Sequence, residues 1–489
     1  MDDRSSLALL TDLYQLTMAA GYHRAGIAER RACFHLTFRR APFQGGYAIA
    51  AGLADAIDYL SRLRFSDVEL GYLRSLTNAD GSPLFAEDFL QMLGRSELRL
   101  DVDAVPEGTV VFAHEPLVRV EGPLWQAQLV ETALLTVVNF QTLVATKASR
   151  VCSVARGANG KPEPVLEFGL RRAQGIDGGL AASRAAYVGG CAGTSNVLAG
   201  LRFGIPVRGT HAHSWVMTFP TERQAFDAYA QTFPKGCIFL VDTYDTLAGV
   251  RNAVAVGHEL RAAGHELVGV RLDSGDLAKL SVDARRILDE GGFPDARIVA
   301  SNDLDEYAIA ELKAAGARID TWGVGTKLVT AFDQPALGGV YKLAALENEN
   351  GVLEPRIKLS EEPIKTSIPA AQQVRRFSDS DGRFVADAIF DVETGLGDLS
   401  LIDPSDPTRM WRVPEGLTHE DLLVPIVRGG EVVYEQPSIG ASRDRARAQL
   451  ARLPEGVRKL RDPEPYFAGL EPDLHHLREK LRAAHAVDG

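Results

Sequence analysis

The sequence predicts an α/β protein whose central part is built on parallel β-strands. Between residues 160 and 345, short apolar runs alternate with helical stretches at a repeat of roughly 30 residues, the length of one β-α unit. Such units in series form either a parallel sheet or a (β/α) barrel. No Gly-x-Gly-x-x-Gly turn opens the series, which disfavours a dinucleotide-binding fold of the Rossmann type.

The strands and helices of this central part are assigned from its apolar pattern. Strands are expected over residues 164–168, 205–209, 237–241, 267–272, 297–300 and 321–324. Helices are expected over residues 246–263, 277–291 and 303–315.

The segment that precedes this central part mixes helical patterns with short strands. Apolar residues at three- and four-residue spacing predict helices over residues 12–22, capped by Thr11, and over residues 49–63. Partial alternation over residues 102–122 predicts a small antiparallel sheet, and residues 129–140 fit a buried helix.

Beyond residue 350 the chain is more polar and nothing in it suggests chemistry. The turn Arg428-Gly429-Gly430 predicts a hairpin, and charged helices are expected over residues 443–453 and 474–484. We therefore expect an N-terminal α/β domain (1–155), a (β/α) barrel with the active site (156–350) and a C-terminal extension of hairpin and helices (351–489).

Composition narrows the class of function. The 489 residues carry a formal net charge of −12, which argues against nucleic-acid or membrane-surface binding but leaves anionic small molecules open. Four widely spaced cysteines suggest reduced thiols, and the acidic N-terminus does not read as a signal peptide. No apolar run reaches about 18 residues. A cytoplasmic enzyme is expected.

Each predicted strand is followed by polar or glycine residues. In a barrel of parallel strands these positions share the carboxyl-terminal rim, where such enzymes build their active sites. The segments in question are Gly169-Leu-Arg-Arg172, Thr210-His-Ala-His-Ser214, Asp242-Thr-Tyr-Asp245, Asp273-Ser-Gly-Asp276, Ser301-Asn-Asp303 and Gly323-Val-Gly-Thr-Lys327.

Each segment also has a purely structural interpretation. Asp273-Ser-Gly-Asp276 fits a helix N-cap, but Arg271 and Asp273 lie on one strand face, and an arginine beside a carboxylate suits a phosphorylated sugar. The glycines of residues 323–326 form either a tight turn or a backbone nest for phosphate. Arg171 and Arg172 could be a solvated pair, and Phe168 could be a core residue.

His211 and His213 offer one competing hypothesis. A His-x-His pair supplies two metal ligands in barrel metallohydrolases. That site needs further ligands at other strand ends, yet no late strand ends in histidine. The pattern therefore disfavours a metallohydrolase.

Taken in order, the motifs resemble one family, nicotinate phosphoribosyltransferase. The match spans nearly the whole chain and includes the Leu-Leu-Val-Pro of the hairpin at 422–425. Its motifs are Leu-Leu-Thr-Asp-Leu-Tyr-Gln-Leu-Thr-Met at 9–18, Pro-Phe-Gln-Gly-Gly-Tyr-Ala-Ile-Ala-Ala-Gly-Leu at 42–53, Glu-Phe-Gly-Leu-Arg-Arg-Ala-Gln-Gly at 167–175, Gly-Thr-His-Ala-His-Ser at 209–214, Val-Arg-Leu-Asp-Ser-Gly-Asp-Leu at 270–277 and Gly-Gly-Val-Tyr-Lys-Leu at 338–343.

The resemblance implies a type II phosphoribosyltransferase fold, an irregular (β/α) barrel with an N-terminal α/β domain and a C-terminal extension, in a homodimer. It implies that nicotinate and phosphoribosyl pyrophosphate give nicotinate mononucleotide and pyrophosphate in NAD salvage, coupled to ATP hydrolysis. The histidine that ATP phosphorylates in the family corresponds to His213. His211 falls at the family's variable position and is expected only to pack.

The resulting site assignment combines the strand-end pattern with the resemblance. The expected catalytic residues are His213, Asp273 and Arg171, and Asp273 is also the candidate Mg²⁺ ligand. Arg271 should bind phosphate, and Gly323, Gly325 and Thr326 should hold the 5′-phosphate. The resemblance assigns nicotinate to Tyr14 (a candidate contribution from the second subunit), Phe168, Arg171, Thr210, Arg318 and Ser367. Ser214, Ser274 and Asn302 complete the expected substrate contacts.

Two departures from the family pattern bear on this assignment. Ala370 follows Pro369 where the family usually has glycine, so a left-handed conformation there would strain the backbone. The segment 193–196 carries Ser195 and lacks the acidic residue of the related nicotinamide enzyme, which favours the acid as substrate. A quinolinate-using relative and a non-catalytic nucleotide-binding scaffold remain the other hypotheses.

Overall fold

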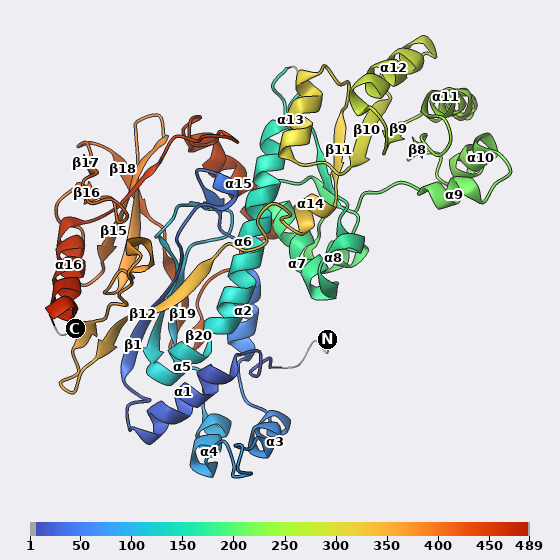
Figure 1. Cartoon of the computed structure of the whole chain (residues 1–489). Coiled ribbons are helices and arrows are strands. Elements are labelled where there is room, and N and C mark those ends of the chain that lie inside the picture. The colour runs from blue at the N-terminus through green and yellow to red at the C-terminus, as the bar shows by residue number, and fades with distance from the viewer. Residues whose placement is uncertain (1–5, 158, 488–489) are drawn as a thin grey trace. The chain divides into compact units, whose positions relative to one another are not determined.

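The computed structural model describes residues 6–157 and 159–487. It contains two compact units, Met1–Leu143 with Ala336–Gly489 (unit 1) and Val144–Pro335 (unit 2), and the division falls inside helix α6 (Glu131–Val154) (Figure 1). The three-part division along the chain stays a sequence-based prediction. Within the described residues, no helix is long and apolar enough to span a membrane.

Unit 2 contains a six-stranded sheet in the order β7-β6-β11-β10-β9-β8, and every strand pairs parallel with its neighbour. The predicted alternation of strands and helices is thereby confirmed. Its strands are β6 (Val165–Glu167), β7 (Gly193–Thr194), β8 (Ile238–Leu240), β9 (Gly269–Leu272), β10 (Arg297–Asn302) and β11 (Thr321–Val324). Its helices are α7 (Gly175–Val188), α8 (Val197–Phe203), α9 (His213–Met217), α10 (Glu222–Thr232), α11 (Thr246–Ala262), α12 (Leu277–Glu290), α13 (Glu306–Ala314) and α14 (Thr326–Val329).

One predicted strand of unit 2 is only a fragment. Residues 205–209 form a single parallel bridge between Val207 and Thr194 of β7. Pro206 has no N–H to donate, so only its carbonyl takes part, accepting from the Thr194 amide. Strand β7 was not predicted, because two residues are too few to give an apolar pattern.

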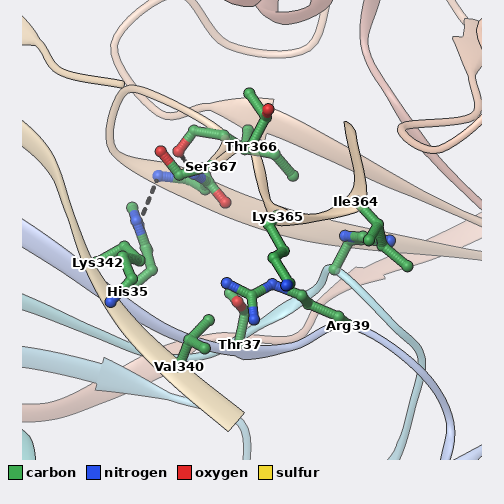
Figure 2. Close-up of a pocket in the computed structure, with 12 residues that line it drawn as sticks. His35, Thr37, Arg39, Val340, Lys342, Ile364, Lys365, Thr366 and Ser367 are labelled. Carbon is green, nitrogen blue, oxygen red and sulfur yellow. Dashed lines mark hydrogen bonds between the residues drawn. The ribbon is translucent and has the colours of Figure 1, made fainter. Parts of the chain in front are cut away.

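Unit 1 contains two larger sheets. The first is antiparallel throughout, in the order β13-β12-β1-β5-β3-β19-β20, and confirms both the sheet at residues 102–122 and the hairpin. Its strands are β1 (Arg31–Phe38), β3 (Asp101–Ala104), β5 (Pro116–Pro123), β12 (Gly339–Glu347), β13 (Leu353–Pro355), β19 (Val424–Arg428) and β20 (Glu431–Val432). His35 and Thr37 on β1 line a pocket over this sheet (Figure 2).

The second sheet of unit 1 comes from the more polar C-terminal part. Its order is β17-β16-β21-β15-β14-β18, and only the β15–β21 pair is parallel. Its strands are β14 (Gln372–Ser378), β15 (Phe384–Asp391), β16 (Ser400–Ile402), β17 (Met410–Arg412), β18 (Thr418–Asp421) and β21 (Phe467–Leu470). The two short strands β2 (Ala48–Ile49) and β4 (Val110–Val111) pair separately.

The helices of unit 1 follow the expected pattern with local corrections. The cap position of α1 is Asp12, not Thr11, whose hydroxyl donates to the Leu129 carbonyl instead. The helix expected from residue 49 starts at Leu53, because Ile49 belongs to β2 and Gly52 is left-handed at φ +98°. The helices are α1 (Leu13–Arg24), α2 (Leu53–Arg62), α3 (Asp67–Ser75), α4 (Glu87–Arg95), α5 (Leu124–Leu129), α15 (Ile439–Arg452) and α16 (Pro472–Val487).

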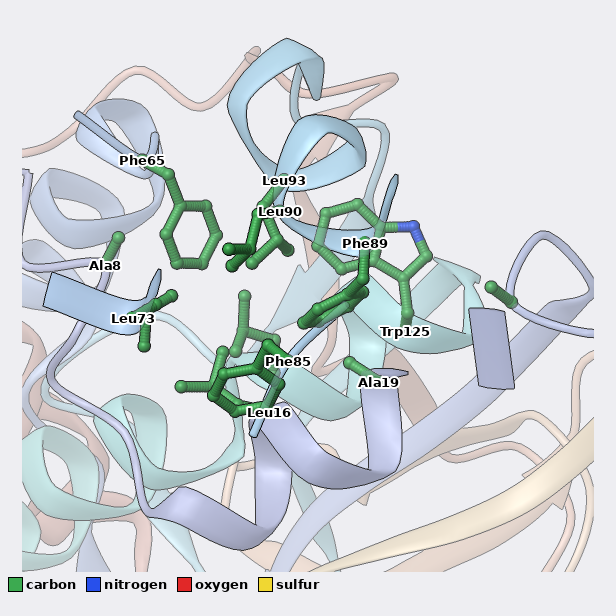
Figure 3. Packing of buried hydrophobic residues seen from close by; sticks show 12 residues of the cluster. Ala8, Leu16, Ala19, Phe65, Leu73, Phe85, Phe89, Leu90, Leu93 and Trp125 are labelled. Atoms are coloured by element: carbon green, nitrogen blue, oxygen red, sulfur yellow. The ribbon is translucent and has the colours of Figure 1, made fainter. Parts of the chain in front are cut away.

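A buried apolar cluster fixes the position of α1 in unit 1. Leu16 and Ala19 of α1 pack with Phe85, Phe89 and Trp125, as Figure 3 shows. Burying side chains of this size stabilises the fold by about 1.5–3 kcal/mol each. The opposite face of α1 therefore remains at the surface.

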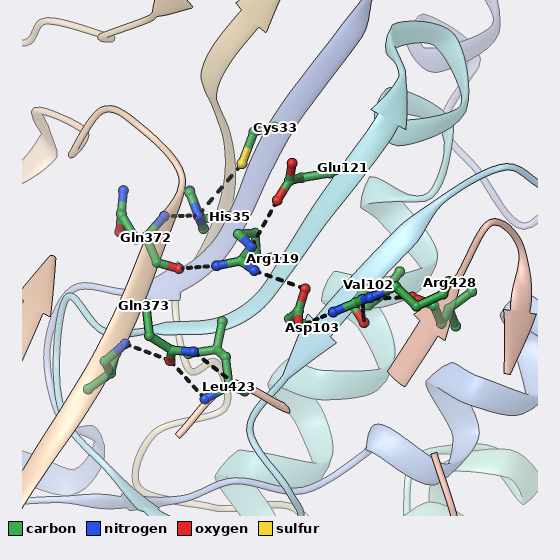
Figure 4. Close-up of polar contacts among 12 residues, drawn as sticks. Cys33, His35, Val102, Asp103, Arg119, Glu121, Gln372, Gln373, Leu423 and Arg428 are labelled. Atoms are coloured by element: carbon green, nitrogen blue, oxygen red, sulfur yellow. Dashed lines mark hydrogen bonds and ion pairs between the residues drawn. The ribbon is translucent and has the colours of Figure 1, made fainter. Parts of the chain in front are cut away.

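Arg119 is paired with groups from both sheets of unit 1. Arg119 of β5 donates to the Gln372 carbonyl at 2.9 Å and to Asp103 Oδ2 at 3.0 Å, and its Nε lies 3.1 Å from Glu121 Oε1 (Figure 4). A buried guanidinium needs this many partners to offset its desolvation. The network thus joins strand β14 to the first sheet.

Candidate active site

Residues from three strand ends of unit 2 meet around His213. His213 is the first residue of α9, and its Nδ1 lies 3.1 Å from the Thr243 hydroxyl. Its Nε2 lies 3.7 Å from Asp273 Oδ2. Because all the strands are parallel, their carboxyl ends lie on one edge of the sheet, which brings these separate segments together.

The two aspartates of Asp273-Ser-Gly-Asp276 have different roles in the structure. Asp276 is the N-cap of α12 and accepts from the Lys279 amide at 3.1 Å. Asp273 caps nothing; its Oδ1 accepts from the Ser301 hydroxyl at 2.5 Å, and its Oδ2 faces His213. The helix N-cap interpretation is correct for Asp276. Asp273 caps no helix, so its Oδ2 is available for chemistry.

Asp242 is a further candidate that was not assigned from the sequence. Its Oδ2 accepts from the Asp273 amide at 3.1 Å and from the Ser274 hydroxyl at 2.6 Å. Its Oδ1 is buried without a hydrogen-bond partner. The sequence signal that could have identified Asp242 is its position directly after the apolar run at 237–241. Asp273 was assigned because it directly follows the run at 267–272 in the same way.

Arg271 of β9 has donor capacity that the protein does not use. Its Nη1 donates to the Thr210 hydroxyl at 2.5 Å, while its Nε is buried without a hydrogen-bond partner. Burial lowers the pKa of Arg271, and the nearby charge of Arg171 acts in the same direction, against the carboxylates of Asp273 and Asp242. An anion bound at this edge would relieve the repulsion between the two arginines.

His211 is a packing residue, as expected. Its Nε2 accepts from the Leu240 amide at 3.2 Å, and its ring lies against Phe226, Tyr229 and Phe239. Burial lowers its pKa to about 4, so the ring is neutral at physiological pH. With Nε2 engaged in the core, His211 and His213 do not form a metal-binding pair. Across the described chain, no group of three or more His, Cys, Asp or Glu side chains is placed to hold a metal.

The β6 segment is held by a buried carboxylate, Glu167. It accepts from the Ser183 hydroxyl at 2.8 Å, from the Thr194 hydroxyl at 2.5 Å and from the Gly169 amide. The next residue is Phe168, whose ring lies so close to Gly323 that a Cβ there would approach it to 2.6 Å. Glycine at 323 is therefore needed for the observed ring position.

The remaining candidates on this edge are more exposed. Arg171 lies in the short helix η2 (Leu170–Arg172), Ser214 follows His213, and Asn302 ends β10 with φ +147°. Gly325 and Thr326 begin α14. The structure thus brings the strand-end candidates of unit 2 to one edge of the sheet.

Arg318 is the exception in unit 2, and its expected place at the site needs correction. It precedes β11 by three residues, and its amide donates to the Ser281 hydroxyl of α12 at 3.0 Å. It therefore lies at the amino edge of the sheet, opposite the strand ends described above. There it lines an open groove with Arg285 and Arg286 of α12.

Two candidates, Tyr14 and Ser367, belong to unit 1. Tyr14 is 48% exposed on the outer face of α1. Ser367 lines the pocket of Figure 2, a cavity of about 40 Å³, and its hydroxyl accepts from the Lys358 amide at 2.8 Å. Arg39, Lys342 and Lys365 also line this cavity, and none of the described residues that line it is a carboxylate.

Ala370 adopts the left-handed conformation considered from the sequence, with φ +68°. It is 3% exposed, and its amide donates to the Ala344 carbonyl at 3.0 Å. The amide is therefore bound to protein. The left-handed backbone at Ala370 directs the chain from Ser367 into β14.

Comparisons with known proteins match this architecture over the whole chain. Residues 9–139 match the nicotinate phosphoribosyltransferase N-terminal domain, 165–383 the nicotinate phosphoribosyltransferase family and 371–478 its C-terminal domain. The chain is similar to nicotinate phosphoribosyltransferase of Bacillus subtilis, 45% identical over 99% of this chain and 96% of the relative, and to that of Homo sapiens, 37% identical over 97% and 96%.

Solved structures agree with the sequence relatives. The crystal structure of human nicotinic acid phosphoribosyltransferase superposes with a TM-score of 0.83 at 35% identity, covering 96% of this chain and 99% of that one. Nicotinate-nucleotide pyrophosphorylase from Pyrococcus furiosus, with a TM-score of 0.69 at 22% identity and coverage of 92% and 97%, shares the fold. These likenesses confirm the predicted fold class. The chain belongs to the nicotinate phosphoribosyltransferase family of enzymes.

Proposed function

We propose that the protein transfers the phosphoribosyl group of phosphoribosyl pyrophosphate to nicotinate, coupled to ATP hydrolysis, and releases nicotinate mononucleotide and pyrophosphate. The observation that carries this proposal is the set of His213, Asp273 and Arg271 on one edge of the parallel sheet. The names of both relatives support nicotinate as the base. ATP and phosphoribosyl pyrophosphate are charged metabolites of the cell interior, which supports a cytoplasmic location.

His213 is the proposed acceptor of the ATP γ-phosphoryl group. When Nδ1 donates to the Thr243 hydroxyl, Nε2 keeps its lone pair and can attack phosphorus while ADP leaves. Asp273, 3.7 Å from Nε2, favours the positive charge that develops on the ring during attack. Hydrolysis of the phosphohistidine returns the free imidazole and inorganic phosphate.

Phosphoribosyl transfer needs stabilisation of an electron-poor ribose and of a leaving pyrophosphate. Asp273 is the proposed partner of the ribose hydroxyls, with Ser274 and Asn302 beside it. Arg271 offers its unused donors to phosphate, and the backbone of Gly323, Gly325 and Thr326 is proposed to hold the 5′-phosphate.

The donor set at this edge fits Mg²⁺. Asp242 has an unpartnered buried oxygen and Asp273 lies next to it, and Mg²⁺ in such sites binds through one or two carboxylates together with substrate phosphates. Asp242 and Asp273 would hold the ion, which neutralises charge on the leaving pyrophosphate when bound.

Nicotinate is proposed to bind beside Phe168. The flat ring of Phe168 provides an apolar surface, and Arg171 and Thr210 provide donors for the carboxylate. In unit 1 we assign Tyr14 and Ser367 to substrate, and the cations that surround Ser367 favour an anionic group. Ser214 completes the proposed contacts beside His213.

The decisive experiment measures turnover of nicotinate, nicotinamide and quinolinate with phosphoribosyl pyrophosphate, each with and without ATP. We expect use of nicotinate, stimulation by ATP, and loss of most of this stimulation in His213→Ala. His211→Ala is the matched control, which should affect stability more than coupling. Preference for nicotinamide or quinolinate, or an ATP-independent wild type, would refute the proposal, and absence of all turnover would support a non-catalytic scaffold.

A homodimer is part of the proposal. Light scattering should give twice the mass of 52.9 kDa. If Tyr14 acts in the partner's site, mixing Tyr14→Ala with His213→Ala, each without ATP-stimulated turnover on its own, should restore about a quarter of the wild-type ATP-stimulated activity, because half the dimers would be hybrids with one intact site. No recovery after verified subunit exchange would place Tyr14 outside the partner's site.

A further inference from the structure

The pocket of Figure 2 contains a buried donor that no protein group satisfies. His35 is 3% exposed on β1 and lines the pocket. Its Nε2 accepts from the Gln372 amide at 3.1 Å, whereas its Nδ1 is buried without a hydrogen-bond partner (Figures 2 and 4). A backbone amide can only donate, so Nε2 must be the unprotonated nitrogen and Nδ1 carries the hydrogen.

The surroundings keep His35 in this state. Burial lowers its pKa to about 3, and the charge of Arg119 on the neighbouring strand acts in the same direction. Arg119 itself is fixed by Asp103, Glu121 and the Gln372 carbonyl. His35 therefore presents a neutral N–H across the physiological pH range, and an unsatisfied buried donor of this kind costs about 1–3 kcal/mol.

The strand pattern of β1 places the pocket's cations around this donor. His35 and Thr37 alternate along β1, so they share one face of the sheet, and Arg39 follows the last residue of the strand, Phe38. Lys342 of β12 is the cross-strand partner of His35. Lys365 comes from the segment before Ser367, and its ammonium is paired with Glu362 outside the lining. Among the residues that the structure describes, donors and cations line the cavity and no carboxylate does.

We infer that His35 is a specificity-determining residue that donates its Nδ1–H to a phosphate oxygen of the substrate bound in this pocket. The inference rests on the proposed function of the pocket as an anion site. Arg39 and Lys342, with Lys365 already paired to Glu362, fit a multiply charged phosphate better than a single carboxylate. A neutral donor adds direction without adding charge, so it selects ligands whose oxygen reaches the base of the pocket.

Two substitutions separate the nitrogens of His35. In His35→Gln the side-chain oxygen can replace Nε2 as the acceptor for the Gln372 amide, but the donor at the Nδ1 position is lost. In His35→Asn the amide nitrogen can replace the Nδ1 donor, but the contact with Gln372 is lost. Arg39→Met tests the pocket's charge independently of His35.

The experiment is calorimetric titration of the full-length protein with inorganic pyrophosphate, and separately with nicotinate, together with thermal unfolding of each variant. We expect His35→Gln to weaken pyrophosphate binding by roughly tenfold to a hundredfold, as for loss of a hydrogen bond to a charged group. His35→Asn should bind within about threefold of wild type while unfolding at a lower temperature.

The outcomes distinguish this inference from the proposal on which it rests. If Arg39→Met weakens pyrophosphate binding but His35→Gln does not, the inference is refuted and the anion pocket stands; a water molecule then satisfies Nδ1. If neither variant changes binding, the anion pocket itself is refuted. If the losses appear with nicotinate and not with pyrophosphate, the ligand group is a carboxylate and the assignment to phosphate is overturned.

Discussion

Ala370→Gly should leave the stability of unit 1 nearly unchanged despite the loss of a buried methyl group, since Ala370 is held at φ +68° and glycine relieves the strain of that conformation. For a residue with a Cβ, the left-handed conformation costs roughly 1–2 kcal/mol. Glycine avoids that cost but loses about 0.5–1 kcal/mol more in unfolded-state entropy than alanine. The buried methyl group of Ala370 is worth about 0.8 kcal/mol more. The three contributions nearly cancel, so the free energy of unfolding should change by less than about 1 kcal/mol.

The neighbouring residue provides a matched control. Ala371 is equally buried at 3% and packs with Cys33 and Ala345, but it is not left-handed. Ala371→Gly loses a buried methyl group, worth about 0.8 kcal/mol, and also incurs the entropy cost of glycine. It should destabilise unit 1 by about 1–2 kcal/mol.

The assay is urea denaturation of both variants beside wild type, supported by thermal unfolding. Ala370→Gly should shift the midpoint temperature by less than about 3 °C, and KM for the substrates should stay unchanged because the hydrogen bond from the residue 370 amide to the Ala344 carbonyl is kept. If Ala370→Gly destabilises the protein as much as Ala371→Gly does, backbone strain at this position is refuted.

Three further predictions concern buried charges. Arg376→Met should lower the free energy of unfolding by about 3–5 kcal/mol in urea titrations, because it leaves the fully buried Asp387 without its guanidinium; a loss below 1 kcal/mol would contradict this. Burial and, as the second cause, the negative charge of Asp387 raise the pKa of Glu115. The folded state therefore keeps a proton that the unfolded state has lost, and the free energy of unfolding falls as pH rises above about 4.5. Glu115→Gln should therefore gain stability relative to wild type between pH 5 and pH 9 in paired denaturation curves, and parallel curves would count against it. Asp242→Asn should lower kcat/KM by roughly tenfold to a hundredfold with little change in midpoint temperature, since one charge beside Asp273 is lost; unchanged kinetics would remove Asp242 from the site.

The local pattern was sufficient for much of the candidate site. Apolar runs separated by helices predicted parallel strands, and parallel strands place all their carboxyl ends on one edge. Asp273, His213 and Arg271 could therefore be grouped from the sequence. The caps of α11, α12 and α13 are Asp245, Asp276 and Asp305, each accepting from a backbone amide three residues on.

The order of the strands in the sheet could not be predicted from the local sequence pattern. Asp242 contacts Asp273 because β8 and β9 are neighbours, and pairing between distant segments leaves no local trace in a single chain. Arg318 was assigned to substrate by the resemblance alone. It precedes the strand predicted over residues 321–324, and β11, which has these bounds, puts it at the amino edge of the sheet. The second sheet of unit 1 was missed because its strands alternate with polar loops.

The sequence by itself determined the fold class, the family motifs and the chemical kinds of residue at the strand ends, since each depends on short segments whose period and composition are local. Only the tertiary structure decided which of those residues meet. It separated Asp273 from the helix cap Asp276, buried His211 while leaving His213 accessible, and left one nitrogen of His35 without a partner. These outcomes depend on which backbone and side-chain atoms from distant parts of the chain form hydrogen bonds with each group. Only the packing of the folded chain determines those partners.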